Sequence, residues 1–169
     1  MLQIGDKAPE FNLKGYLKNK IKDYSSKEFK GKWIVLFYYP ADFTFVCPTE
    51  VMSLSNAAEE FKKLNSVVLG ISTDSVYSHQ KWSEELGGLD IALLSDFHKR
   101  TSRDYNVLDE DSGESQRGLF IIDPEGTLRY FLVSDGSVGR STPELLRVIS
   151  ALQTGKLCPA EWKPGEATL

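Results

Sequence analysis

The stretch Tyr38–Glu50 reads YYPADFTFVCPTE, and the patterns on either side of it decide the fold. The apolar run Trp33–Tyr39 leads into it and stops at Pro40, which is typical of a strand buried on both faces. Residues Val51–Leu64 follow with apolar side chains at helical spacing, which predicts one helix with a buried face. Cys47, one of only two cysteines in the chain, lies where this helical pattern begins.

Length and composition are those of an ordinary globular domain. The chain has 169 residues, of which 41% are hydrophobic and 26% charged, so one domain with a full core is expected. Its net charge of −4 argues against nucleic acid and anionic membranes as main partners, because neither attracts an acidic surface. Met1–Asp6 shows no signal-peptide pattern, and no apolar run is long enough to span a bilayer. We therefore expect a cytoplasmic protein that binds neither membranes nor nucleic acid.

Hydrophobic periodicity and turn residues predict the order of the elements. Short apolar pieces at Phe11–Leu13 and Ile21–Tyr24 predict a hairpin around a Lys14–Lys20 turn. The first buried strand, the helix after it and a second buried strand at Val67–Ser72 make a right-handed parallel crossover. The remaining expected elements are a helix at Ser75–Leu86, a strand at Ile91–Ser95, a short helix at Phe97–Tyr105, paired strands at Gly118–Asp123 and Leu128–Val133, and a helix at Thr142–Thr154.

This order of elements indicates the fold class. A parallel unit followed by an antiparallel hairpin and a closing helix is the thioredoxin-like arrangement, an α/β fold with a central mixed sheet flanked by helices. We expect a single domain, 1–169, with an N-terminal hairpin and an exposed, mobile C-terminal arm at 155–169. Asp74 or Ser75 is expected to cap one helix, and Thr142 to cap the last.

Three local features indicate that Cys47 is an activated thiol. It stands at or near a helix start, with Pro48 just inside, where unpaired N–H groups and partial positive charge favour a thiolate. It shares a helical face with Val51 and Leu54, so its sulfur is expected to point inward into a shallow pocket. Thr44 lies upstream on the same loop, and its hydroxyl is expected to reach the sulfur or a small oxygen-bearing substrate.

A cation beside the sulfur is needed as well. An ordinary thiol is only about 3% ionised at pH 7, and making it mostly thiolate takes about 2.7 kcal/mol. A helix end supplies about 0.3–2 kcal/mol of this, so we expect a guanidinium to supply the rest. Arg117 is the favoured candidate because it immediately precedes the buried strand Gly118–Asp123. The other arginines considered are Arg100, Arg103, Arg129, Arg140 and Arg147.

Simpler interpretations of the same residues stay open at this point. The two cysteines also fit two inert buried thiols. Taken alone, Thr44 fits a turn residue and Arg117 a surface charge next to a loop. Glu50 fits an acidic residue in the first turn of a helix, and it also occupies the place of the second cysteine in a thioredoxin-type Cys-x-x-Cys motif.

A metal site is the other chemical alternative that the sequence raises. The residues available for it are Cys47, Cys158, His79 and His98, and their spacings match no zinc pattern. We therefore expect no metal, and we interpret the two histidines as single surface residues.

The stretch around Cys47 resembles the peroxiredoxin family. Pro40, Thr44 and Cys47 match its Pro-x-x-x-Thr-x-x-Cys signature. The surrounding residues 43–50 are similar to the typical two-cysteine subgroup, which includes the alkyl hydroperoxide reductase C component and thioredoxin peroxidases.

Three further segments carry the same resemblance over essentially the whole chain. Residues 117–123 (RGLFIID) resemble the segment with the family's active-site arginine, here Arg117. Residues 138–140 resemble the segment with its second arginine. Residues 157–165 (LCPAEWKPG) resemble the segment with its resolving cysteine, here Cys158.

The resemblance implies a thiol-dependent peroxidase that needs no cofactor and reduces hydrogen peroxide and organic hydroperoxides to water and alcohols. Cys47 would be oxidised to a sulfenic acid, with Pro40 shielding its thiolate. Thr44 and Arg117 would bind and polarise the peroxide. Cys158 from the neighbouring subunit would then form a disulfide with the oxidised residue.

The resemblance also implies supporting residues and partners. Glu50 and Arg140 are expected to form an ion pair that orients Arg117, and Trp82 is expected to lie near the active site. A thioredoxin-like or flavoprotein-linked disulfide reductant would reduce the disulfide. The subunits would form a homodimer by edge-strand pairing and assemble into a ring, expected to be a decamer. A holdase chaperone or structural ring protein stays open as an alternative or second function.

The sequence departs from the family members that are most prone to over-oxidation. Those members have Gly-Gly-Leu-Gly where this chain has Gly87-Gly88-Leu89-Asp90. They also have a C-terminal helix ending in Tyr-Phe, whereas this sequence stops at Leu169. We therefore expect an enzyme that resolves quickly and resists over-oxidation.

Overall fold

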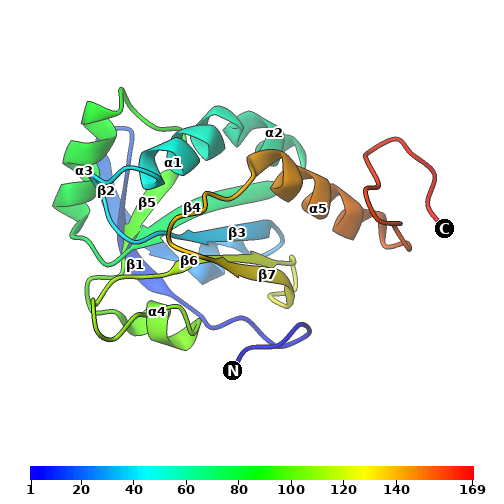
Figure 1. The fold of residues 1–169 in the computed structure, drawn as a ribbon, viewed down its shortest axis with the longest axis horizontal. Helices are drawn as coiled ribbons and strands as arrows, with labels where there is room; N and C mark the ends of the chain where they lie inside the picture. The colour runs from blue at the N-terminus through cyan, green and yellow to red at the C-terminus, as the bar shows by residue number, and fades with distance from the viewer.

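The computed structural model describes residues 1–169 and is built on one mixed sheet of seven strands in the order β2-β1-β5-β4-β3-β6-β7 (Figure 1). Strands β3, β4 and β5 are parallel, and every other pairing is antiparallel. The strands are β1 Asn12–Leu17, β2 Lys20–Ser25, β3 Trp33–Tyr38, β4 Ser66–Ser72, β5 Ala92–Ser95, β6 Arg117–Ile122 and β7 Leu128–Ser134. This sheet confirms the predicted thioredoxin-like α/β fold.

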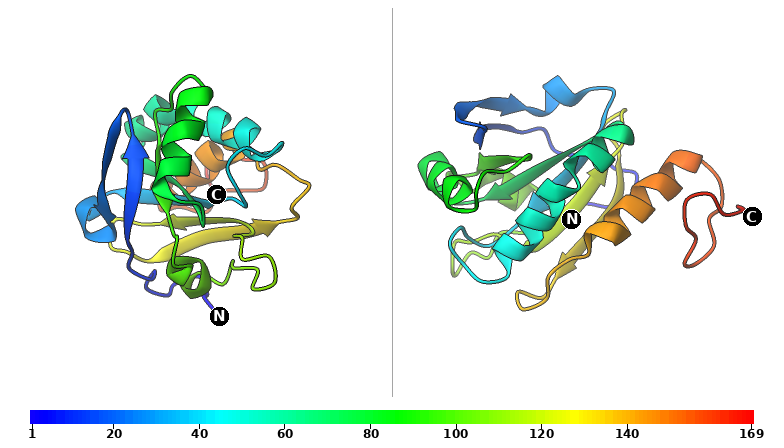
Figure 2. Two further views of the ribbon diagram at one scale, coloured as in Figure 1. Left: turned by 90° about the vertical axis from the view of Figure 1, so that its left-hand side faces the viewer. Right: turned by 90° about the horizontal axis from the view of Figure 1, so that it is seen from above.

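Helices cover both faces of the sheet. Four of them, α1, α2, α3 and α5, lie on one side, and the short α4 lies on the other (Figures 1 and 2). Their bounds are α1 Cys47–Asn56, α2 Ala58–Lys63, α3 Val76–Glu85, α4 Arg100–Asp104 and α5 Thr142–Thr154, with a 3-10 helix, η1, at Ser26–Phe29. None of these helices combines the length and the apolar character needed to cross a membrane.

Strand β3 separates two hydrophobic cores. Val35 and Phe37 belong to the core under α1, α2 and α5, whereas Ile34 and Leu36 belong to the core on the opposite face. All six residues of β3 are buried, as the uninterrupted apolar run predicted. The strand that leads to Cys47 is therefore fixed from both sides.

The predicted single helix at Val51–Leu64 is wrong, because the chain breaks it at Ala57. Helix α1 ends at Asn56 and α2 begins at Ala58, with the Ala57 backbone at φ −92° and ψ 6°. The buried face nevertheless continues across the break, so its apolar spacing gave no sign of it. The residues just before the break include serine and asparagine, which are weak helix formers.

The N-terminal hairpin is tighter than predicted. Its turn consists of Lys18 and Asn19 alone, with φ values of 47° and 64°, which is the signature of a two-residue turn. Strand β1 also pairs with β5, so the hairpin extends the central sheet. The outer strand β2 exposes charged side chains such as Lys22 and Asp23 along that edge of the sheet.

The opposite edge of the sheet has a different character. Among the strands β7 pairs only with β6, although its first residue, Leu128, also exchanges backbone hydrogen bonds with Gly5 and Asp6. Its exposed residues include Phe131 and Val133, which are 41% and 47% accessible. This edge therefore presents apolar side chains beside unpaired backbone groups.

Two further expectations, about where helices begin, are wrong. The last helix is capped by Ser141, whose Oγ accepts from the Glu144 N–H, and not by Thr142, which is its first residue. Thr142 instead accepts a hydrogen bond from Ser53 at 2.8 Å. The predicted helix at 97–105 is shorter, since Lys99 adopts a left-handed conformation and only Arg100–Asp104 is helical.

The C-terminal arm, expected to be exposed, buries one large side chain. Trp162 is 4% accessible, and its indole Nε1 donates to the Glu166 carbonyl at 3.1 Å. Arg147 on α5 donates to the Trp162 carbonyl at 3.2 Å. The arm is thus folded on itself beyond the last turn of α5 (Figure 2).

Gly15 in β1 tests how closely the hairpin packs on the sheet. A Cβ at this position would overlap the Leu94 side chain and lie 2.8 Å from Cδ2 of Tyr24. Gly15→Ala is therefore expected to lower the free energy of unfolding by about 1–3 kcal/mol, measured by urea denaturation. Gly136→Ala is the control, because nothing lies within 4 Å of a Cβ there. Equal stability of both variants would contradict the packing described.

Candidate functional site

The structure places Cys47 as the first residue of α1, with its side chain fully buried at 0% accessibility. The last backbone hydrogen bond between β3 and β4 before the loop is donated by the Tyr39 N–H to the Ile71 carbonyl. Pro40 then ends the strand because it has no N–H to donate. A seven-residue loop, 40–46, follows and turns the chain. Helix α1 therefore starts above the carboxyl end of β3. No side chain caps α1, so the partial positive charge of the helix start is not neutralised by a cap and lies beside the sulfur.

Arg117 contacts the sulfur from the neighbouring strand. It is the first residue of β6, which pairs with β3, and its side chain is 5% accessible. Its Nη1 lies 3.3 Å from Cys47 Sγ, and its Nε donates to the Gly136 carbonyl at 2.8 Å. A charged donor is thus held against the thiol by a second, independent hydrogen bond.

Glu50 binds two arginines at once. Its Oε1 accepts from Arg117 Nη1 at 2.6 Å, and its Oε2 accepts from Arg140 Nε at 2.7 Å. The Arg140 backbone N–H also donates to Oε2, at 2.9 Å. All three side chains are at most 5% accessible, so these ion pairs are shielded from solvent.

Arg140 is fixed by contacts beyond Glu50. Its Nη1 donates to the Gly118 carbonyl at 2.6 Å, and its guanidinium lies 3.5 Å from the centre of the Phe37 ring. Burial lowers the pKa of Arg140 from its ordinary value, and hydrogen bonding to Glu50 opposes that shift. Two guanidinium groups and one carboxylate leave the cluster with a net positive charge beside the sulfur of Cys47.

Thr44 and Pro40 lie on the loop before α1, but neither contacts the sulfur through a hydrogen bond. The Thr44 hydroxyl donates to the Ala41 carbonyl at 2.9 Å, which leaves its lone pairs free to accept. Pro40 and Arg117 line the same cavity, of about 580 Å³. The cavity therefore reaches the guanidinium that contacts Cys47.

Trp82, a residue of α3, packs against the loop that precedes α1. Its ring lies 5.6 Å from that of Tyr39 and 6.4 Å from that of Phe43, centre to centre, and its side chain is buried. Phe43 itself has a φ of 57°, a left-handed conformation that is uncommon for an aromatic residue.

Cys158 is not brought to Cys47 within one chain. Both thiols are free, and Cys158 is half-buried, with Sγ 3.4 Å from Thr154 Oγ1. It lies on the arm that follows α5, whereas α1 begins on the side of the molecule where α3 lies (Figure 1). The two cysteines of a single chain are therefore at different ends of the molecule.

The prediction of two surface histidines is wrong for one of them. His98 is exposed, but His79 is 0% accessible and contacts Asp42, a residue of the loop before Cys47. Nothing in the spacing of α3 revealed this, although an aspartate between apolar residues was a sign that its carboxylate needs a partner. No group of three or more His, Cys, Asp or Glu side chains gathers anywhere in the structure.

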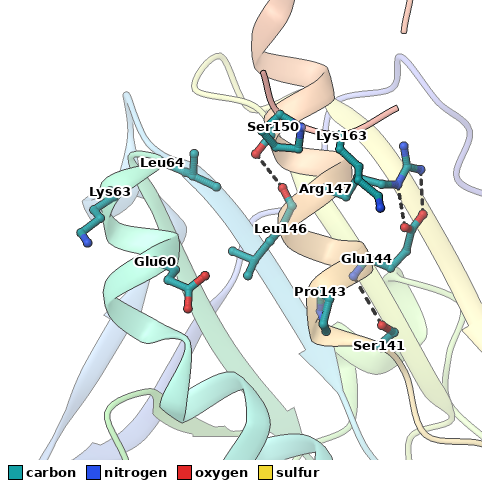
Figure 3. A pocket seen from close by; sticks show the side chains of 11 residues that line it. Glu60, Lys63, Leu64, Ser141, Pro143, Glu144, Leu146, Arg147, Ser150 and Lys163 are labelled. Carbon is teal, nitrogen blue, oxygen red and sulfur yellow. Dashed lines mark hydrogen bonds and ion pairs between the residues drawn. The ribbon is translucent and has the colours of Figure 1, made fainter. Parts of the chain in front are cut away.

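A larger cavity, of about 700 Å³, lies away from both thiols. It is between α2 and α5, and its lining includes Glu60, Leu146 and Lys163 (Figure 3). Of the charged side chains that line it, Glu144 and Arg147 pair with each other at 2.7 Å, and all of them lie at the surface of α2, α5 and the C-terminal arm. We therefore locate the candidate site at Cys47, where the buried charges converge, and not in this cavity.

Comparisons with known proteins identify the family of the chain. The model of the AhpC/TSA family matches residues 4–131. The chain is 48% identical to peroxiredoxin prdx-2 of Caenorhabditis elegans over 176 residues, which cover 98% of this chain and 88% of that protein. It is 46% identical to the putative peroxiredoxin YkuU of Bacillus subtilis over 175 residues, covering 98% and 97%.

Solved structures give the same result. A reduced 2-Cys peroxiredoxin of Plasmodium vivax aligns with a TM-score of 0.93 and 38% identity, covering 98% of this chain and 91% of that one. AhpC of Enterococcus faecalis aligns with a TM-score of 0.89 and 35% identity, covering 94% and 100%. None of these matches favours a chaperone or a structural ring protein.

Glu50 is expected to be essential for the stability of this cluster. Glu50→Ala leaves two buried guanidinium groups without their shared carboxylate, so the free energy of unfolding should fall by about 3–5 kcal/mol. The measurement is urea denaturation. Glu84→Ala is the matched control, because it removes a glutamate that pairs with Lys81 at the surface. A Glu50→Ala variant as stable as the control would contradict the role of this carboxylate.

Proposed function

The chain belongs to the AhpC/TSA family and is a peroxiredoxin, a thiol-dependent peroxidase, and we propose that Cys47 is the residue that peroxide oxidises. The observation that carries this proposal is the contact of 3.3 Å between Arg117 Nη1 and Cys47 Sγ at the first residue of α1. A guanidinium and a helix start together favour an ionised sulfur, which is the nucleophilic form of a cysteine.

In the proposed reaction the thiolate of Cys47 attacks one oxygen of the peroxide. A sulfur–oxygen bond forms as the oxygen–oxygen bond breaks, and the leaving hydroxide or alkoxide takes up a proton to become water or an alcohol. The sulfur is left as a sulfenic acid. Hydrogen peroxide and organic hydroperoxides both supply the bond that this step needs.

The surrounding residues have distinct roles in the proposal. Arg117 donates to the peroxide oxygens as charge develops on them, and the hydroxyl of Thr44 provides a second polar contact. Pro40 excludes water from the sulfur. Glu50 and Arg140 orient Arg117 through the buried ion pairs, and Trp82 supports the loop from α3.

The second half of the proposed cycle uses Cys158 of a neighbouring subunit. Its thiol attacks the sulfenic acid, water leaves, and a disulfide joins the two subunits. The arm that carries Cys158 lies at the other end of the molecule from Cys47, which supports a disulfide between subunits. A thioredoxin-like or flavoprotein-linked dithiol then reduces the disulfide, which suits the reducing conditions of the cytoplasm.

The proposed assembly is a homodimer that forms a ring of ten subunits. The exposed apolar edge of β7, with Phe131 and Val133, supports pairing of two subunits through this strand. Such pairing would continue the sheet from one subunit into the next.

The roles of the two cysteines can be separated by substitution. Cys47→Ser is expected to abolish peroxide-dependent oxidation of reduced thioredoxin, because no sulfenic acid can form. Cys158→Ser is expected to consume one equivalent of peroxide per subunit and then stop, because the sulfenic acid cannot be resolved. Steady-state turnover in Cys158→Ser equal to that of the wild type would rule out the resolving role.

The intersubunit disulfide predicts the size of the oxidised species. After one equivalent of peroxide, the wild type should migrate as a covalent dimer on non-reducing denaturing electrophoresis. The Cys47→Ser and Cys158→Ser variants serve as controls and should migrate as monomers. A monomeric band for the oxidised wild type would show that the disulfide is not between subunits.

A further inference from the structure

A carboxylate–imidazole pair is buried beneath the loop that leads to Cys47. The side chains of Asp42 and His79 are 1% and 0% accessible, and Asp42 Oδ2 lies 2.8 Å from His79 Nδ1. The other ring nitrogen, Nε2, lies 3.0 Å from the carbonyl oxygen of Leu94 in β5. The pair therefore connects the loop, helix α3 and the central sheet.

Asp42 is bound on every side. The hydroxyl of Tyr39 donates to Oδ1 at 2.7 Å, and the hydroxyl of Ser78 donates to Oδ2 at 2.8 Å. The backbone N–H of Asp42 donates to Asp74 Oδ2 at 3.0 Å. The loop is thus held at this one residue through both its side chain and its main chain.

These partners determine where the protons are. The Leu94 carbonyl can only accept, so Nε2 of His79 must carry a hydrogen. Nδ1 faces a carboxylate that already accepts from two hydroxyl groups, so Nδ1 is assigned as a donor as well. The charged or titratable groups around the ring are Tyr39, Asp42 and Asp74, and Asp74 is occupied by the hydroxyl of Ser72 and the N–H of Asp42. The hydrogen-bond geometry thus assigns both ring nitrogens of His79 as donors, to Asp42 and to Leu94.

The loop that this pair holds is not in a relaxed conformation. Phe43, the next residue, has a φ of 57° and packs on Trp82 of α3. Thr44 follows, with its hydroxyl bonded back to the Ala41 carbonyl. A loop with a left-handed aromatic residue keeps this shape only when its surroundings hold it there.

We propose that Asp42 and His79 are positioning residues for the peroxide reaction. The pair fixes the loop so that the Thr44 hydroxyl stands in a constant place relative to the sulfur of Cys47. The negative charge of the thiolate is balanced elsewhere, by Arg117 and the start of α1. The pair therefore affects how peroxide is oriented, and not how readily the sulfur ionises. This inference rests on the proposed roles of Cys47 and Thr44.

The protonation of His79 is the first test. In a ¹⁵N NMR spectrum of the histidine side chains at pH 7, both ring nitrogens of His79 should carry a proton in the wild type. In Asp42→Asn, the amide can donate to Nδ1, so only Nε2 should remain protonated. His98 is the only other histidine and provides an internal reference. An unprotonated Nδ1 in the wild type would overturn the ion pair.

The second test separates peroxide orientation from thiol ionisation. All variants are made in a Cys158→Ser background, so that Cys47 is the only thiol. The rate of its oxidation by hydrogen peroxide should fall about tenfold in His79→Gln and in Asp42→Asn, because displacement of a reacting group by about 1 Å can cost about 100-fold. The rate of alkylation by iodoacetamide, which needs only the thiolate, should stay the same. His98→Gln, at an exposed site, should change neither rate.

The outcomes separate the possible explanations. Unchanged peroxide rates in both variants, measured well below their unfolding temperatures, would show that the pair only stabilises the fold. A parallel fall of both rates would show that it acts on the thiol itself, and either result overturns the inference. If the larger changes prevent folding, Ser78→Ala removes one hydrogen bond to Asp42 and should lower the peroxide rate about twofold to threefold. An unreactive Cys47 in the unsubstituted background would instead overturn the proposed function.

Discussion

Two buried guanidinium groups share a single carboxylate beside Cys47, and this imbalance of charge shapes the site. Glu50 satisfies one positive charge, and a second remains within 3.3 Å of the sulfur. Burial of an unbalanced charge is costly, and further contacts of the two guanidinium groups offset part of that cost. These contacts are made with the carbonyl groups of Gly118 and Gly136 and with the ring of Phe37.

The sheet topology explains why these groups meet. Strand β6 pairs antiparallel with β3, so the start of β6 lies next to the end of β3. Arg117 is the first residue of β6, and the loop after β3 leads to Cys47. The segment after β7 then returns Arg140 to the same place. Three segments that are far apart in the sequence meet at one end of two neighbouring strands, where side chains are held by rigid backbone.

Local signals in the sequence indicated Cys47 and Arg117 as candidates, and the family resemblance decided for them against the simpler interpretations. The end of an apolar strand at Pro40 and the start of a helical pattern placed Cys47, and the position of Arg117 at a strand end selected it among the arginines. The break at Ala57 could not be predicted, because the buried face continues through it. The burial of His79 could not be predicted either, since its partners come from a loop and from β5, and neither contact follows from spacing along a helix. The spacing of residues also could not predict the partner of Cys158, because in the proposed mechanism that partner is Cys47 of a neighbouring subunit.

The two edges of the sheet have opposite properties, and this limits how copies of the chain can aggregate. Charged side chains such as Lys22 and Asp23 along β2 discourage another strand from adding there, whereas β7 offers apolar side chains and free backbone groups. A sheet with only one receptive edge can join one other sheet, and the resulting pair has no receptive edge left. In the proposed dimer, growth by strand addition would therefore stop at two copies, and the sheet would not extend into fibrils.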